Sequence, residues 1–144
     1  MKPLARPLAE FLARALPIDD RYDAIVPVPL HWRKRWRRGY NQSELLARCM
    51  AGKRGIPVWN ALRRRRPTAV QAGLTNAARR RNVAGAFAVK SARAAARLAG
   101  KRILLIDDVM TTGATAGACA TALKRGGAAS VSLLTLARVD RRFI

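Results

Sequence analysis

Acidic residues, histidine and cysteine are scarce in this sequence of 144 residues. Eight Asp and Glu residues stand against 29 Lys and Arg residues, and the formal net charge of +21 favours polyanionic partners such as phosphorylated ligands, RNA or DNA. The only histidine is His31. Together with the two cysteines it cannot supply the four ligands of a usual zinc site. We expect Cys49 and Cys119 to be buried small apolar residues within helices.

Long apolar runs are also missing. No run approaches the roughly 20 residues that a membrane-spanning helix needs. Glu10 and Arg14 interrupt the apolar stretch near the N-terminus, which argues against a signal peptide. Half of the residues are nevertheless apolar, as is typical of a globular domain rather than a disordered chain. We therefore expect one domain over residues 1–144, without a membrane partner, in the cytoplasm.

The positive charge is concentrated in residues 31–81, which hold fifteen Lys and Arg residues and a single acid, Glu44. This segment is a candidate surface for polyphosphates such as pyrophosphate or for a nucleic-acid backbone. Trp32 and Trp36 lie within it, where they can stack on bases or pack against the domain. The alternative is that the Arg side chains only solvate a surface.

Apolar periodicity and turn residues predict strands that alternate with helices. This order indicates an α/β fold with a mainly parallel sheet, and ligands of such sheets bind at the carboxyl ends of the strands. Asn41 or Ser43 is the expected N-cap of the second helix. The predicted helices are residues 3–16, 41–53 and 115–125. The predicted strands are residues 24–28, 56–62, 83–89, 102–107 and 130–139. Residues 30–40 are predicted to form a basic loop, residues 63–82 a long mobile loop and residues 90–100 Ala-rich turns.

The most informative stretch is residues 103–115, which read Ile-Leu-Leu-Ile-Asp-Asp-Val-Met-Thr-Thr-Gly-Ala-Thr. Four apolar residues indicate a buried parallel strand, and Asp107 and Asp108 follow at its end. A Thr/Gly loop then leads into a helix. Carboxylates accept hydrogen bonds from hydroxyl groups, and the unpaired N–H groups of a helix N-terminus favour an anion. The stretch therefore predicts a site for a phosphorylated sugar.

This stretch resembles the phosphoribosyl-pyrophosphate (PRPP) signature of type I phosphoribosyltransferases. Two further pairs of segments resemble the ComF/GntX group, which includes a competence protein linked to DNA uptake. The resemblance covers about residues 23–139 and implies a type I phosphoribosyltransferase-like α/β fold, with a mainly parallel sheet flanked by helices. Many relatives carry an N-terminal four-cysteine zinc module, which we do not expect here. The segments are Pro27-Val-Pro-Leu-His31 with Arg38-Gly-Tyr-Asn-Gln-Ser43, and Gln71-Ala-Gly-Leu74 with Arg81-Asn-Val-Ala-Gly-Ala-Phe87.

The resemblance implies a role for each matching residue. Asp107 and Asp108 would be the catalytic carboxylates that hold the ribose hydroxyls of PRPP, with Mg²⁺ carried by PRPP and not by a direct protein site. Thr111 stands where some purine-using relatives carry an acid, which argues against a purine acceptor of that type. The residues expected to bind the 5-phosphate are Thr111, Thr112, Gly113, Ala114 and Thr115. Those expected to bind pyrophosphate are Leu30, His31 and Arg38, and those of the flexible loop are Gln71, Arg81 and Asn82.

Two functions agree with these features. The first is a phosphoribosyltransferase, a glycosyltransferase that moves the phosphoribosyl group of PRPP to an unidentified nitrogen acceptor and releases pyrophosphate. The alternative is a non-catalytic PRPP-sensing or adaptor protein of competence and DNA uptake, which binds DNA or a DNA-processing partner through its basic segment. Association into a homodimer is left open. An NTPase is excluded because the sequence has no G-x-x-x-x-G-K-[ST] motif.

Overall fold

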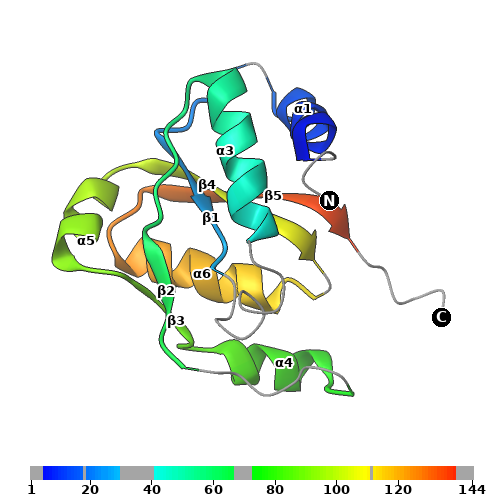
Figure 1. Cartoon of the computed structure of the whole chain (residues 1–144). Helices are drawn as coiled ribbons and strands as arrows, with labels where there is room; N and C mark the ends of the chain where they lie inside the picture. Colours follow the sequence, from blue (N-terminus) through cyan, green and yellow to red (C-terminus); the bar gives the residue numbers. More distant parts are fainter. Residues whose placement is uncertain (1–4, 18, 30–40, 67–72, 111, 139–144) are drawn as a thin grey trace.

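A parallel sheet of three strands, in the order β1-β4-β5, forms the centre of the structure (Figure 1). The structure is a computed structural model that describes residues 5–17, 19–29, 41–66, 73–110 and 112–138. An isolated parallel bridge adds Val58 to Ile25 of β1. In chain order the elements are α1 (Ala5–Ala15), β1 (Ala24–Pro27), α3 (Gln42–Arg54), β2 (Leu62–Arg64), α4 (Asn76–Val83), β3 (Phe87–Val89), α5 (Ala92–Leu98), β4 (Arg102–Met110), α6 (Ala114–Arg125) and β5 (Ser130–Arg138).

Helices cover both faces of this sheet, because the side chains of β4 alternate between two apolar clusters. Leu104 and Ile106 pack with α1 and α3 on one face. Ile103 and Leu105 pack with α6 on the other face, where Leu123 is fully buried. The continuous apolar run of β4 is thus explained by burial on both sides, as is usual for a central parallel strand.

A small antiparallel pair, β2 with β3, lies against α6 outside the main sheet (Figure 1). Its register sets Leu62 opposite Val89 and Arg64 opposite Phe87. The chain between the two strands contains α4, which also contacts α6. This arrangement brings a segment of residues 62–89 alongside the helix that follows β4.

The predicted α/β fold with a parallel sheet is confirmed, and β1, β4, β5, α1, α3 and α6 lie close to their expected ranges. Three local predictions were wrong. The strand expected at residues 56–62 is reduced to the bridge at Val58 and the start of β2. The strand expected at residues 83–89 begins only at Phe87. Residues 63–82 are not simply a loop, since they hold the end of β2 and most of α4.

A fourth local prediction was also wrong, because residues 90–100 contain the helix α5 rather than turns. Both missed helices begin at a capping hydroxyl. Thr75 accepts a hydrogen bond from the N–H of Ala78 at 3.2 Å, and Ser91 accepts one from the N–H of Ala94 at 3.1 Å. Caps and alanine-rich composition therefore specify these helices without an apolar stripe. The basic loop expected at residues 30–40 lies outside the described residues.

Both cysteines lie in helices, as expected, and neither is in a disulfide. Cys119 of α6 is buried, whereas Cys49 of α3 is partly exposed. None of the helices in the described part of the chain combines the length and the apolar character needed to cross a membrane.

Candidate functional site

The two adjacent carboxylates lie where β4 passes the carboxyl end of β1. Val28, directly after β1, donates its N–H to the carbonyl of Ile106 at 2.9 Å, so Asp107 follows immediately beside the end of β1. Asp107 is 9% exposed, and Asp108 is partly buried. β4 continues beyond both of them to Met110, so the pair lies within the strand rather than at its end as predicted. The side chains nevertheless reach the edge of the sheet at which parallel α/β folds bind ligands.

The first turn of α3 is fixed beside this edge. Asn41 is the N-cap of α3, and its side-chain oxygen accepts a hydrogen bond from the N–H of Ser43 at 3.1 Å. Its side-chain amide donates to the carbonyl of Val28 at 3.0 Å. These two contacts tie α3 to the end of β1.

Ser43 is a site residue that the sequence interpretation missed. Its side chain is 3% exposed and forms a hydrogen bond with the carboxyl of Asp107. We had considered Ser43 only as an alternative helix cap. Its position at the end of the Arg38–Ser43 motif was a usable signal, because that motif leads from the end of β1 into α3.

The environment of Asp107 favours its protonated form. Burial, followed by the charge of Asp108, raises the pKa of Asp107 to about 7, and the hydrogen bond from Ser43 opposes this rise. The Asp108 N–H donates to Asp107 Oδ1 at 3.0 Å, and the Val109 N–H donates to Asp108 Oδ1 at 2.9 Å. The pair can therefore exchange a proton near neutral pH, a property that is frequent in functional sites.

A buried thiol lies on the α6 side of the pair. Cys119 is fully buried, and burial together with the charge of Asp107 raises the pKa of its thiol well above the usual range. Arg64 acts in the opposite direction on that thiol and lies over the ring of Phe87, 5.3 Å from its centroid. Cys119 thus remains a protonated, apolar core residue rather than a nucleophile.

The loop after β4 leads directly into the N-terminus of α6. Gly113 adopts the left-handed conformation with φ of +76°, which glycine tolerates without a Cβ penalty. No side chain caps α6, although Thr112 Oγ1 accepts a weak hydrogen bond from the N–H of Ala114 at 3.3 Å. Apart from that of Ala114, the N–H groups of the first turn are therefore available to an anion.

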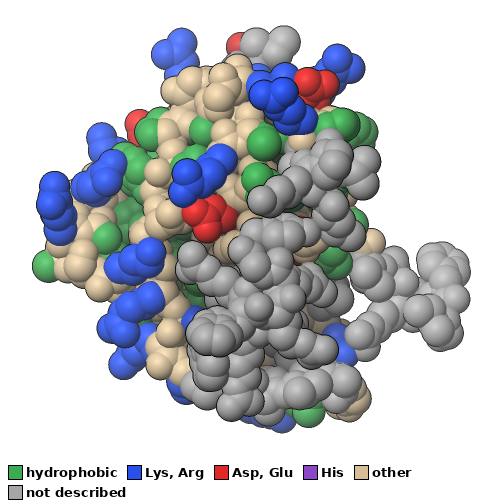
Figure 2. Space-filling view, in the orientation of Figure 1, with side chains coloured by type: hydrophobic (Ala, Val, Ile, Leu, Met, Phe, Trp, Pro, Cys, Tyr) green, Lys and Arg blue, Asp and Glu red, His purple; other side chains and the backbone are tan. Residues whose placement is uncertain are grey.

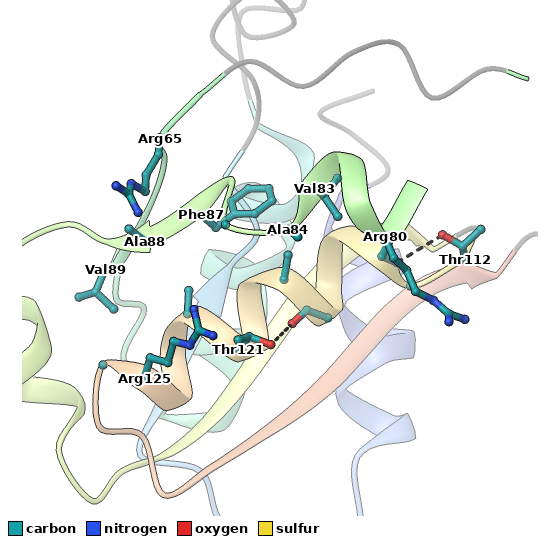
Figure 3. A pocket seen from close by; sticks show the side chains of 17 residues that line it. Arg65, Arg80, Val83, Ala84, Phe87, Ala88, Val89, Thr112, Thr121 and Arg125 are labelled. Carbon is teal, nitrogen blue, oxygen red and sulfur yellow. Dashed lines mark hydrogen bonds between the residues drawn. The ribbon is translucent and has the colours of Figure 1, made fainter. Parts of the chain in front are cut away.

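A groove of about 660 Å³ runs along α6 from this loop (Figure 3). Its walls come from α4, β3 and the exposed side of α6, and none of the described residues that line it is acidic. Arg80 lies at the end that contains Thr112, while Arg65 and Arg125 lie toward the other end (Figure 3). The middle is apolar. The remaining lining residues are Val83, Ala84, Gly85, Phe87, Ala88, Val89, Gly113, Ala114, Gly117, Ala118, Thr121, Ala122 and Gly126.

The structure brings some of the predicted site residues to one region. Thr112, Gly113, Ala114 and Thr115 follow Asp107 and Asp108 directly, and α4 carries Arg81 and Asn82 against α6. Arg81 is exposed and Asn82 is partly buried. The neighbouring Arg79, which the sequence interpretation did not select, is buried. The predictions for Leu30, His31, Arg38, Gln71 and Thr111 fall on residues outside the described ones.

The acidic pair is compatible with a magnesium ion that arrives with its ligand. Among the described residues no group of three or more His, Cys, Asp or Glu side chains could hold a metal ion. Mg²⁺ commonly takes one or two protein carboxylates and completes its shell with water and substrate phosphates. Asp107 and Asp108 fit that limited protein contribution.

Basic side chains outnumber acidic ones on the visible surface. Figure 2 shows Lys and Arg gathered over α5 and the β2–β3 pair, with few acidic groups among them. Only two ion pairs occur within the described residues, between Arg48 and Glu44 and between Lys53 and Glu10. Most of the positive charge is therefore not neutralised internally and contributes to an attractive field for polyanions.

Comparison with known proteins agrees with this arrangement. The chain is 41% identical over 125 residues to the DNA utilization protein YhgH of Salmonella typhi, which covers 85% of this chain and 51% of that protein. It is 37% identical over 117 residues to competence protein F of Haemophilus influenzae, which covers 81% of this chain and 50% of that protein. The chain thus spans about half the length of these curated relatives.

Solved structures support the fold. The glutamine PRPP amidotransferase of B. subtilis, complexed with ADP and GMP, matches with a TM-score of 0.63 at 21% identity, over 94% of this chain and 26% of that chain. The UMP synthase of Leishmania donovani matches with a TM-score of 0.57 at 20% identity, over 95% of this chain and 23% of that chain. At this level of identity the similarity concerns the fold alone. Residues 36–142 match the phosphoribosyl transferase domain family, and this chain therefore belongs to that family, in its ComF group of competence and DNA-utilization relatives.

Proposed function

We propose that this protein binds PRPP together with Mg²⁺ and transfers the phosphoribosyl group to a nitrogen acceptor, with release of pyrophosphate. The observation that carries the proposal is the succession of the Asp107–Asp108 pair and an uncapped helix N-terminus within one short stretch of chain. This spacing suits a sugar whose hydroxyls meet carboxylates while its phosphate meets backbone N–H groups.

In this proposal Asp107 and Asp108 accept hydrogen bonds from the two ribose hydroxyls. The bond between C1 of the ribose and the pyrophosphate oxygen breaks, and the electron pair leaves with pyrophosphate. The acceptor nitrogen forms the new bond to C1 with its lone pair and afterwards loses its proton. The carboxylates stabilise the positive charge that develops on the ribose ring, so the protein acts by positioning and electrostatics.

Bound Mg²⁺ would neutralise part of the phosphate charge and improve the leaving group. The residues of this chain that suit it are Asp107 and Asp108. The raised pKa of Asp107 has a consequence here, because a cation or a hydroxyl donor at the carboxylate favours the ionised form. PRPP binding is therefore expected to release a proton at pH values below about 7.

The test is a calorimetric titration with PRPP and Mg²⁺ at physiological salt, beside a pyrophosphate control. The control is needed because a protein of charge +21 attracts any polyphosphate. Wild-type protein should bind PRPP more tightly than pyrophosphate. A variant with both Asp107→Asn and Asp108→Asn should bind the two ligands with similar affinity. Equal binding of both ligands by both proteins would reject a ribose site.

Turnover separates the enzyme from a sensor. Release of pyrophosphate from PRPP that depends on an added nitrogen compound supports transfer. PRPP binding without such release across an acceptor screen supports the alternative, a PRPP-sensing or adaptor protein.

The alternative function includes contact with DNA or a DNA-processing partner, and the basic groove along α6 favours it. Arg65, Arg80 and Arg125 line this groove without any acid, and the names of several relatives refer to DNA utilization and competence. A cytoplasmic location and a homodimer remain parts of the proposal that need separate measurement.

A further inference from the structure

Arg79 in α4 is a buried arginine whose charge has no acidic partner among the described residues. It is 2% exposed, and its Nε atom is buried without a hydrogen-bond partner. Of the eight acidic residues in the sequence, only Asp140 lies outside the described part. The ion pairs found in that part join Arg48 to Glu44 and Lys53 to Glu10. Arginine is almost never fully buried unless it is paired, so this side chain needs an explanation.

The position of Arg79 relates it to the candidate site. Val83 lies one helical turn further along α4, is buried and lines the groove beside α6. Residues four apart share one face of a helix, so Arg79 lies on the side of α4 that faces inward. Arg80, the next residue, lines the end of the groove that contains Thr112 (Figure 3). Arg81, by contrast, is exposed.

The energetics favour a ligand as the missing partner. An unpaired guanidinium that is removed from water destabilises the folded protein, because it loses hydration without gaining a counter-charge. A phosphate group entering at the start of α6 would supply both the charge and the paired acceptor oxygens that a guanidinium matches. A residue that served only the fold would be expected to carry a carboxylate or carbonyl partner in the free protein.

We infer that Arg79 is a binding residue for a phosphate group of the substrate, and that α4 forms a wall of the site through this side chain. The inference rests on the proposed function only in identifying the phosphate as that of PRPP. PRPP carries two candidate groups, the 5-phosphate and the pyrophosphate. Ribose 5-phosphate and pyrophosphate, used as separate probes, distinguish them.

The experiment compares Arg79→Met with Arg93→Met, which removes the same charge from an exposed position in α5 outside the groove. Each protein is titrated calorimetrically with ribose 5-phosphate, pyrophosphate and PRPP with Mg²⁺, and each is melted without ligand. Arg79→Met should lose at least tenfold in affinity for PRPP and for one of the two smaller probes. Arg93→Met should stay within about twofold of the wild type. The ligand-free Tm of Arg79→Met should equal or exceed that of the wild type, because an unpaired buried charge has been removed.

Arg79→Lys covers the case in which Arg79→Met fails to fold. It retains the charge but not the planar fork, so its affinity should fall severalfold while the affinity of Arg93→Lys is unchanged. Equal affinities for the two lysine variants would overturn the inference, as would an Arg79→Met protein that melts lower and binds every probe normally.

The outcomes also separate this inference from the proposed function. If PRPP binds better than pyrophosphate but Arg79→Met behaves like Arg93→Met, the inference fails and the function stands. If a smaller probe depends on Arg79 while PRPP has no advantage, Arg79 is an anion-binding residue and the PRPP function fails.

Discussion

The side chain of Ser43, in the first turn of α3, forms a hydrogen bond with the buried carboxyl of Asp107 in β4. The two residues are far apart in sequence, and Asn41 brings them together by capping α3 and bonding to Val28 at the end of β1. This contact favours the ionised form of Asp107, whereas burial and Asp108 favour the protonated form. The charge of the acidic pair is thus set by the helix α3 and the strands β1 and β4 together.

Substitution of Ser43 by Ala should shift the titration of Asp107 to higher pH. The hydrogen bond that stabilises the carboxylate is lost, which costs on the order of 1 kcal/mol of differential stabilisation. The measurement is the pH dependence of PRPP affinity by calorimetry between pH 5.5 and about 8.5, where the wild type should gain affinity as the pH rises through about 7. The midpoint should be higher in Ser43→Ala. Ser91→Ala, which removes a capping hydroxyl from α5, is the control and should leave the midpoint unchanged.

An Asp107→Asn variant should be more stable than the wild type above neutral pH. The pKa of Asp107 is about 7 in the folded protein and near its usual value of 3.8 in the unfolded chain. Between these values the folded state binds more protons, so stability falls as the pH rises and the full penalty is present above about pH 7. Removal of the charge should raise the free energy of unfolding by on the order of 2 kcal/mol at pH 8. The free energy of unfolding should then change less with pH between about 4 and 7.

Urea unfolding at a series of pH values measures this effect. Asp19→Asn is the matched control, because Asp19 is exposed and should leave the profile as in the wild type. An Asp107→Asn protein that was less stable than the wild type at pH 8 would mean that the carboxylate is stabilised in the fold.

The sequence predicted the centre of the fold well because the signals there are local. Four consecutive apolar residues predicted β4, and the acids and the Thr/Gly loop after them predicted where a ligand could bind. The contact between Ser43 and Asp107 was not predictable from either segment, since it depends on how α3 is fixed against β1.

The helix α4 shows why the buried Arg79 was not indicated by the sequence. Its buried face carries Arg79 as well as Val83, so the apolar stripe that usually indicates an amphipathic helix is interrupted by a cation. The family resemblance, which matches Arg81 and not Arg79, gave no further signal for the buried residue, and Arg81 is exposed.

Gly113→Ala should weaken both the fold and phosphate binding. Gly113 has φ of +76°, and a Cβ there would strain the backbone by about 1 kcal/mol. The loop would relax away from the conformation that exposes the first N–H groups of α6, so affinity for ribose 5-phosphate should fall. Gly117→Ala is the control within the same helix. A Cβ at Gly117 would meet no atom within 4 Å, so this substitution should stabilise α6 by about 0.5–1 kcal/mol.

Thermal melting and calorimetry with ribose 5-phosphate measure both effects. Opposite changes in Tm for the two alanine variants are expected, with loss of affinity in Gly113→Ala alone. A Gly113→Ala protein that bound the phosphate as well as the wild type would show that the left-handed turn does not shape the anion site.

Binding of single-stranded DNA, if the groove along α6 provides it, should depend steeply on salt. Phosphate contacts made by Arg65, Arg80 and Arg125 release counterions, and each contact adds roughly 0.7 to the slope of log K against log salt for a single strand. Replacing all three by Gln should reduce that slope by about 2. Fluorescence anisotropy with a labelled oligonucleotide at four salt concentrations gives the slope. The control replaces three exposed arginines outside the groove, Arg14, Arg21 and Arg93, so that net charge changes equally. If both triple variants lose the same slope, the protein binds DNA through its overall charge and the groove has no special part in it.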